Sequence, residues 1–155
     1  MSLRTHQLTV IIALILGMVA DSAVAGAWGE GSFENDDAID WVTTCTSSKS
    51  ISPVRDALEG ALGGKYLQAS DGSSAVAAAE VVAAARGKPN PTLPAGLAAW
   101  LKQQPARALS DLTPLATRAL TRVRDPKVSE LRQLWDEGNS ARWLALIDDL
   151  ESRLR

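Results

Sequence analysis

The sequence predicts an all-α fold, a single-domain bundle of about five to seven helices preceded by a lead-in that contains glycine and tryptophan. Every long segment after residue 25 repeats its apolar residues with helical spacing, and none sustains the two-residue alternation of a strand. The linkers between these segments are too short to separate a second domain. Residues 26–155 form a stretch of 130 residues, which is long enough to bury one hydrophobic core.

Residues 1–25 have the features of a cleaved export signal. Arg4 places a positive charge near the start, residues 8–20 are almost entirely apolar, and Ala23-Val24-Ala25 gives the small-x-small pattern that signal peptidase accepts. An uncleaved membrane anchor is the alternative, but this apolar run of 13 residues is shorter than the ~20 that a spanning helix needs. We therefore expect a signal peptide over 1–25, a helical domain over 26–155, and a periplasmic or secreted product.

The composition excludes several classes of function. The net charge of −2 is unchanged when Arg4 and Asp21 leave with the signal, so the domain has no general attraction for nucleic acid or for an anionic membrane. The only histidine, His6, also leaves, and no imidazole remains for a catalytic triad or a zinc site. The only cysteine, Cys45, has no partner for an internal disulfide and lies among apolar helix positions, which predicts a buried, inert thiol. We expect no metal and no cofactor.

Apolar spacing and capping residues predict the first two helices. Either Asn35 or Asp36 is expected to cap the first helix. Ser52 is expected to cap the second, with Pro53 at its first position and Gly63-Gly64 at its end. The predicted apolar faces contain Ala38, Trp41, Val42 and Cys45 in the first helix, and Val54, Ala57, Leu58, Ala61 and Leu62 in the second.

The middle of the chain predicts a loop and then a helix of small residues. Residues 65–74 are polar and contain Gly and Ser, which is typical of a loop. The stretch AVAAAEVVAAAR (75–86) is rich in alanine, which indicates a central helix that its neighbours approach closely. Glu80 lies in the middle of this stretch. Its carboxylate is either buried, and then needs a partner or a raised pKa, or reaches solvent on a partly exposed face.

Further helices are predicted in the second half, at 95–103, from about Pro114, after Ser129 and at 143–154. The last is the clearest, because its apolar residues follow helical spacing closely, while its charged residues are expected to face water. Trp143, Leu146, Ile147, Leu150 and Leu154 form the apolar set, and Asp148, Asp149, Glu151 and Arg153 the charged set. The tryptophans at 41, 100, 135 and 143 are expected to anchor the core, each needing an acceptor for its indole N–H.

The stretch GAWGEGSFENDDAID (26–40) invites two functional interpretations and one structural interpretation. Three glycines before a helix are reminiscent of a phosphate-binding loop, but four neighbouring carboxylates would repel an anion. The acids also offer calcium ligands, but their spacing does not match an EF-hand. We favour a helix start at which acids complement the dipole, Asn35 or Asp36 is the cap, and Trp28 and Phe33 pin the lead-in onto the bundle. The acids are Glu30, Glu34, Asp36 and Asp37, the glycines are Gly26, Gly29 and Gly31, and the calcium candidates are Glu34, Asn35, Asp36, Asp37 and Asp40.

The run G-A-W-G-E-G-S-F-E-N-D-D-A-I-D-W (26–41) resembles the opening of DUF4259, a bacterial family of uncharacterised domains with the signature G-x-W-G-x-G-x-F-x-N-D-x-A-x-D-W/F. The resemblance extends through AAAEVVAAARG (77–87), LPAGLAAW (93–100) and SELRQLW (129–135) to a terminal W-x₆-L-x₃-L pattern. It implies an all-helical fold and no established activity. Many relatives begin directly at this motif, whereas here a predicted signal peptide precedes it.

Two functions from different classes fit these features. The first is a non-catalytic module of the cell envelope that binds a protein partner, of an interaction, inhibitor or immunity type, and that is monomeric and free of the membrane after signal cleavage. The alternative is a hydrolase that uses Glu80 with Asp36 or Asp40, but glycoside hydrolysis needs two carboxyls ~5 Å or ~6.5–9.5 Å apart across a cleft. The candidate binding or structural residues are Gly26, Trp28, Phe33, Asn35, Asp36, Asp37, Asp40, Trp41 and Glu80.

Cleavage after Ala25 would also create a free α-amino group at Gly26. We expect this group to be held against the bundle by the nearby Trp28. The sequence therefore suggests that the new N-terminus forms a partly buried ion pair with Glu80, which would make the loss of either member costly.

Overall fold

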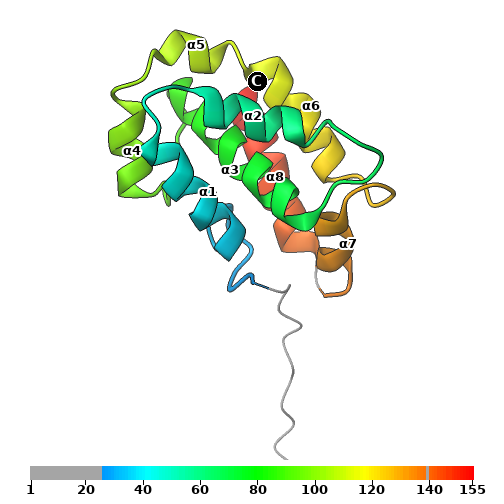
Figure 1. Ribbon diagram of the computed structural model, residues 1–155. Coiled ribbons are helices and arrows are strands. Elements are labelled where there is room, and N and C mark those ends of the chain that lie inside the picture. Colours follow the sequence, from blue (N-terminus) through cyan, green and yellow to red (C-terminus); the bar gives the residue numbers. More distant parts are fainter. Residues whose placement is uncertain (1–25, 139) are drawn as a thin grey trace, which may run out of the picture.

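The computed structural model describes residues 26–138 and 140–155, and it confirms an all-α, single-domain bundle (Figure 1). Within these residues no strand forms, and the only β-type pairings are two isolated bridges, Ala27 with Asn35 and Leu67 with Ser129. Seven helices have seven or more residues, and the remaining one, α5, has five. The helices are α1 (Asp36–Ser47), α2 (Ser52–Gly60), α3 (Ala69–Ala85), α4 (Ala95–Leu101), α5 (Ala106–Ser110), α6 (Thr113–Val123), α7 (Glu130–Asp136) and α8 (Ser140–Leu154).

The predicted signal peptide falls on residues 1–25, which lie outside the described part of the chain. Among the described helices, none combines the length and the apolar character that crossing a bilayer would require.

The central element is α3, which packs against each of the other seven helices (Figure 1). Every residue from Ala75 to Ala83 is buried, so this part of the helix has no face toward water. Alanine and valine make this possible, because their small side chains let several helices approach one axis at once. The prediction of a central, small-residue helix is confirmed.

Helix α3 begins at Ala69, so the prediction of a loop over 65–74 is wrong for its second half. The reason is tertiary, since the carboxylate of Glu130 accepts a hydrogen bond from the backbone N–H of Ala69 at 2.8 Å and thereby caps the helix from a distant segment. Gly72 is a packing residue rather than a helix breaker. A Cβ at this position would lie 3.2 Å from Cβ and Cδ2 of Leu131, so glycine lets α7 approach.

Asn35 caps α1, as expected, and Ser129, which was predicted only to precede a helix, caps α7. The side chain of Asn35 accepts from the N–H of Ala38 at 2.8 Å, and that of Ser129 accepts from Arg132 at 3.3 Å. Ser52 is instead the first residue of α2, because Ile51 already has near-helical backbone angles and precedes the helix without a side-chain cap. This helix also ends at Gly60, before the predicted stop at Gly63-Gly64.

The core tryptophans join helices through their indole groups. Trp41 donates to the carbonyl of Pro53 at 3.3 Å, and Trp100 donates to the carbonyl of Ser48 at 2.7 Å, so both contacts fix the connection between α1 and α2. Trp135 and Trp143 stack with ring centroids 6.1 Å apart. The expected acceptor for Trp135 is absent from the described residues, where its buried Nε1 has no hydrogen-bond partner.

Helix α8 buries one stripe of side chains: Trp143, Ile147, Leu150 and Leu154. Leu146 was predicted to belong to this stripe but is exposed. The buried residues repeat at intervals of four, three and four, and Leu146 lies beside this line at its outer edge. A single exposed leucine is common on a protein surface.

Cys45 is fully buried in the core, as predicted, and burial raises the pKa of its thiol from 9.0 to about 12. The protonated thiol is therefore favoured in the folded state. Its contribution to stability is complete below pH 9 and is lost as the pH rises from 9 toward 12.

We predict that Cys45 in the folded protein does not react with a water-soluble thiol reagent at pH 8, whereas one equivalent reacts in denaturant. Between pH 9 and 12, the free energy of unfolding should fall more steeply for the wild type than for Cys45→Ala, because only the wild type carries the thiol. Chemical denaturation across this pH range measures both. Rapid labelling without denaturant would contradict the burial.

Candidate binding site at the N-terminal loop

The N-terminal loop, residues 26–35, closes on itself immediately before α1. Three backbone hydrogen bonds of 3.0 Å and one isolated antiparallel bridge give it a hairpin-like shape. The bonds run from Trp28 N–H to Glu34 C=O, from Glu34 N–H to Gly31 C=O and from Asp36 N–H to Gly26 C=O, and the bridge joins Ala27 to Asn35. The path of the loop is therefore defined by its own backbone.

The glycines of this loop make room for an internal carboxylate. The side chain of Glu34 folds back and accepts from the N–H of Gly31 at 2.8 Å. A Cβ at Gly29 would lie 2.1 Å from Glu34 Oε2, and one at Gly31 would lie 2.9 Å from it. The amide that an anionic ligand would use is thus already engaged by a carboxylate of the protein.

The predicted acidic residues line the start of α1 but do not converge. Asp36, Asp37 and Asp40 are all exposed, and the first two lie in the first turn of the helix, where they complement its dipole. Across residues 26–138 and 140–155, no group of three or more His, Cys, Asp or Glu side chains is placed to hold a metal ion.

The two aromatic residues of the loop have opposite environments. Phe33 is buried, as is Trp41 in the helix that follows. Trp28 was predicted to pin the loop to the bundle, but 62% of its surface is exposed. The closed backbone directs only Phe33 inward, so this residue anchors the loop and Trp28 is left in solvent.

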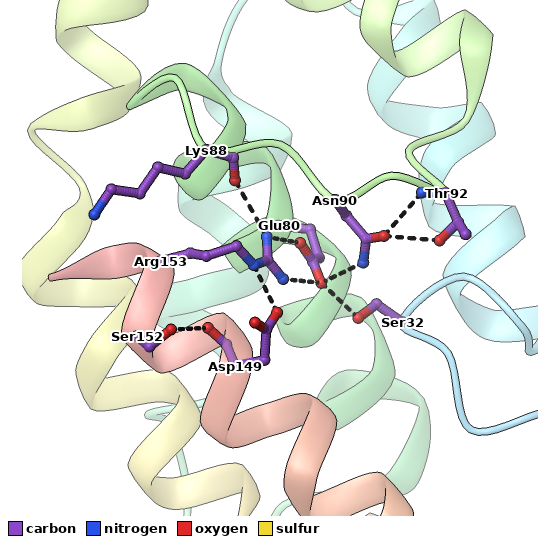
Figure 2. Close-up of polar contacts among 8 residues, drawn as sticks. All are labelled: Ser32, Glu80, Lys88, Asn90, Thr92, Asp149, Ser152 and Arg153. Atoms are coloured by element: carbon purple, nitrogen blue, oxygen red, sulfur yellow. Dashed lines mark hydrogen bonds and ion pairs between the residues drawn. The ribbon is translucent and has the colours of Figure 1, made fainter.

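Glu80 is buried, with 1% of its surface exposed, and its carboxylate has four hydrogen bonds (Figure 2). Arg153 of α8 binds both oxygens, with Nη1 at 2.7 Å from Oε2 and Nη2 at 2.9 Å from Oε1. The hydroxyl of Ser32 donates to Oε1 at 2.8 Å, and the amide of Asn90 donates to the same oxygen at 2.9 Å. This is a bidentate, charge-assisted pair with two further donors.

The predicted ion pair between Gly26 and Glu80 is wrong, because Arg153 is the cationic partner of Glu80. Gly26 lies beside Asp36 instead, with its carbonyl bonded to the Asp36 N–H. Arg153 was expected to face water, but only 15% of its side chain is exposed. Its position three residues after buried Leu150 is the sequence feature that could have placed it on the inner side of α8.

The Glu80 cluster, defined as Ser32, Glu80, Asn90 and Arg153, joins four segments of the chain (Figure 2). Its members come from the N-terminal loop, α3, the segment after α3, and α8. Asn90 is itself oriented, because its side-chain oxygen accepts from the N–H and the hydroxyl of Thr92, both at 2.9 Å. Sequence reasoning identified Glu80 and missed the three residues that bind it.

The charge of Arg153 is fixed by its surroundings. Burial alone would lower the pKa of its guanidinium, but the hydrogen bonds and charges of Glu80, and then of Asp149, outweigh burial and raise this pKa above its ordinary value. Arg153 Nε donates to Asp149 at 2.8 Å, and its Nη1 also reaches the carbonyl of Lys88 at 3.3 Å. Arg153 is therefore a permanent cation inside the bundle.

Two hollows near these elements bear on the alternative of a hydrolase. A pocket of about 30 Å³ lies under the N-terminal loop and is lined by Glu30 and Asp37, but not by Glu80, Asp36 or Asp40. It has room for water rather than for a substrate. An open groove of about 550 Å³ lies between the end of α1 and α4. Its lining of hydroxyls, amides and Lys49 contains no carboxylate.

A family model described as "Domain of unknown function (DUF4259)" matches residues 26–145. No curated protein and no solved structure matches the chain. The matched region contains Ser32, Glu80 and Asn90 of the Glu80 cluster, whereas Arg153 follows it.

Glu80 is more deeply buried than Arg153, so removing Arg153 should lower the free energy of unfolding more than removing Glu80. Arg153→Gln should lower the free energy of unfolding by about 3–5 kcal/mol, because it leaves the buried Glu80 charge unpaired. Glu80→Gln should cost less, about 3 kcal/mol, since Arg153 keeps Asp149 as a partner. The double variant should cost less than the sum of the two.

Urea denaturation measures these changes, and Arg124→Gln is the matched control. Arg124 pairs with Asp148 at 2.9 Å and with Glu151 at 3.0 Å, also on α8, but its side chain is 35% exposed. Its loss should therefore cost only about 0–1 kcal/mol. If Arg124→Gln and Arg153→Gln lower the free energy of unfolding equally, burial does not make the Glu80–Arg153 pair more stabilising than an exposed pair.

Proposed function

Because the chain belongs to the DUF4259 family, whose description names no activity, we propose its function from its geometry. The protein is an exported, non-catalytic module of the cell envelope that binds a protein partner through its N-terminal loop. An inhibitor or immunity-type role fits such a module.

The observation that carries this proposal is the exposed Trp28. Its indole stands in solvent on a loop that is closed by hydrogen bonds and anchored by Phe33. Tryptophan is among the residues that contribute most to protein–protein binding, and most of the Trp28 side chain is not packed in the isolated domain. An ordered loop also loses little conformational entropy on binding, which favours affinity.

The charges near Trp28 indicate the chemistry of the partner. Asp36, Asp37 and Asp40 are exposed on the helix that follows the loop, and Glu30 is partly exposed within it. The partner therefore offers an apolar pocket for the indole with basic side chains around it, since complementary charges accelerate encounter and select the correct partner.

The hydrolase alternative has less support. Both oxygens of Glu80 are engaged by Arg153, and a carboxylate bound in this way is not free to attack a substrate. Asp36 and Asp40 are exposed on α1, and neither they nor Glu80 line the small pocket under the loop. These contacts and positions therefore favour a binding role over a hydrolase that uses Glu80.

We predict that export removes residues 1–25 and that the mature protein begins at Gly26. The motivation is the Ala23-Val24-Ala25 site after a short apolar run. N-terminal sequencing of the protein recovered from the envelope or medium of the producing cells tests this. A product that retains Met1 would exclude cleavage and favour the uncleaved membrane anchor instead.

We predict that Trp28→Ala weakens partner binding by about 30-fold or more without lowering thermal stability, as expected for an exposed hot-spot residue. The partner is captured by crosslinking from envelope extract, identified and purified, and its affinity is then measured by calorimetry. Leu146→Ala is the matched control, because Leu146 is an exposed apolar residue on α8. Its affinity should stay within about twofold of the wild type.

Equal affinities for Trp28→Ala and the wild type would refute the proposed surface. If Trp28→Ala and Leu146→Ala lose the same amount of affinity for the partner, the association is nonspecific and driven by exposed apolar side chains in general.

A further inference from the structure

The geometry assigns a positioning role to Ser32, Glu80 and Arg153: together they fix the orientation of the loop that carries Trp28, and α8 thereby controls the binding surface. This inference rests on the proposed function for its meaning, but its test does not require a partner.

The orientation of the N-terminal loop depends on its contacts with the bundle. Phe33 holds it to the core by an apolar contact, which resists withdrawal but has no preferred direction. The Glu30–Arg142 ion pair is 3.8 Å long with an arginine that is 79% exposed, so it contributes little. The hydrogen bond from Ser32 to Glu80 is short, directional and partly buried. It is therefore the contact that selects one orientation.

Glu80 is held in place from two sides, by its position on α3 and by Arg153. It lies on the enclosed part of α3 and is 1% exposed, and the surrounding helices hold this part of α3 in place. Arg153 binds both carboxylate oxygens and prevents rotation of the carboxyl group (Figure 2). Loss of Arg153 would leave a buried charge, which draws in water or a new partner and displaces Ser32.

Coupling between the loop and α8 is reciprocal, because thermodynamic linkage acts equally in both directions. If α8 stabilises the loop through Arg153 and Glu80, then a partner that holds the loop in its bound shape must stabilise the docking of α8 by the same free energy. Ser32 and Arg153 come from segments far apart in the sequence, and this coupling joins them at one carboxylate. The Glu80 cluster is its physical route.

Hydrogen exchange of the backbone amides tests the inference on the purified protein, followed by NMR. The reporters are the amides of Trp28, Gly31, Glu34 and Asp36, which are hydrogen-bonded in the closed loop. Ser32→Ala should accelerate their exchange by about tenfold or more, because it removes a hydrogen bond to a charged group. The amides of Val81 and Val82 in α3 should remain within about twofold of the wild type, since local opening leaves the core closed.

Three further variants separate positioning from general stability. Ser32→Thr keeps the hydroxyl and should restore slow exchange in the loop. Arg153→Gln should accelerate exchange in the loop and in the core, and Arg124→Gln should leave the loop unchanged despite removing another ion pair of α8. Loop exchange in Ser32→Ala that stays within twofold of the wild type would overturn the inference. Equal acceleration of loop and core amides in that variant would also overturn it.

These outcomes are distinct from failure of the proposed function. Fast loop exchange in Ser32→Ala together with normal partner affinity in Trp28→Ala would retain the positioning role and reject the Trp28 surface. The opposite pair of results would retain the surface and reject the positioning role.

Discussion

The ion pair between Glu80 and Arg153 depends on the enclosure of α3 and in turn organises the parts of the chain around it. Helix α3 contacts all seven other helices, so a carboxylate on its buried stretch cannot reach water. Such a charge requires a cation and further donors, because desolvation is otherwise too costly. Arg153, Ser32 and Asn90 meet this requirement from three other segments. One buried group thus fixes the relative positions of the N-terminal loop, the segment after α3, and α8.

The same enclosure explains the composition of the core. Helices can surround one axis only if the central side chains are small, and the stretch from Ala75 to Ala83 contains only alanine, valine and Glu80. Large side chains are supplied by the outer helices, for example Trp41 and Trp100, whose indole groups bond to backbone carbonyls outside the central helix. The large side chains that pack the core therefore come mainly from the helices around α3 and not from α3 itself.

Features that depend on neighbours along the chain could be predicted from the sequence, and features that depend on distant segments could not. Asn35 and Ser129 are recognisable caps because the groups they bind are three residues away. The early start of α3 depends on Glu130, which is 61 residues distant, and Gly72 is misleading because it serves contact with Leu131. At the candidate site, Glu80 was identifiable from its apolar surroundings. Its partners were not, since a single arginine on an amphipathic helix is normally solvated.

The contrasting environments of the tryptophans have an optical consequence. Trp41, Trp100 and Trp143 are shielded from solvent, and Trp135 is half-buried and stacked on Trp143. Trp28 alone among the five is mainly in water, so it emits at the longest wavelength and is the ring most accessible to a dissolved quencher. The stacked rings lie close enough for their electronic transitions to couple, which adds a far-ultraviolet dichroism signal that a single indole lacks. Fluorescence therefore reports on the loop and dichroism on the packing of α7 against α8, within one unlabelled molecule.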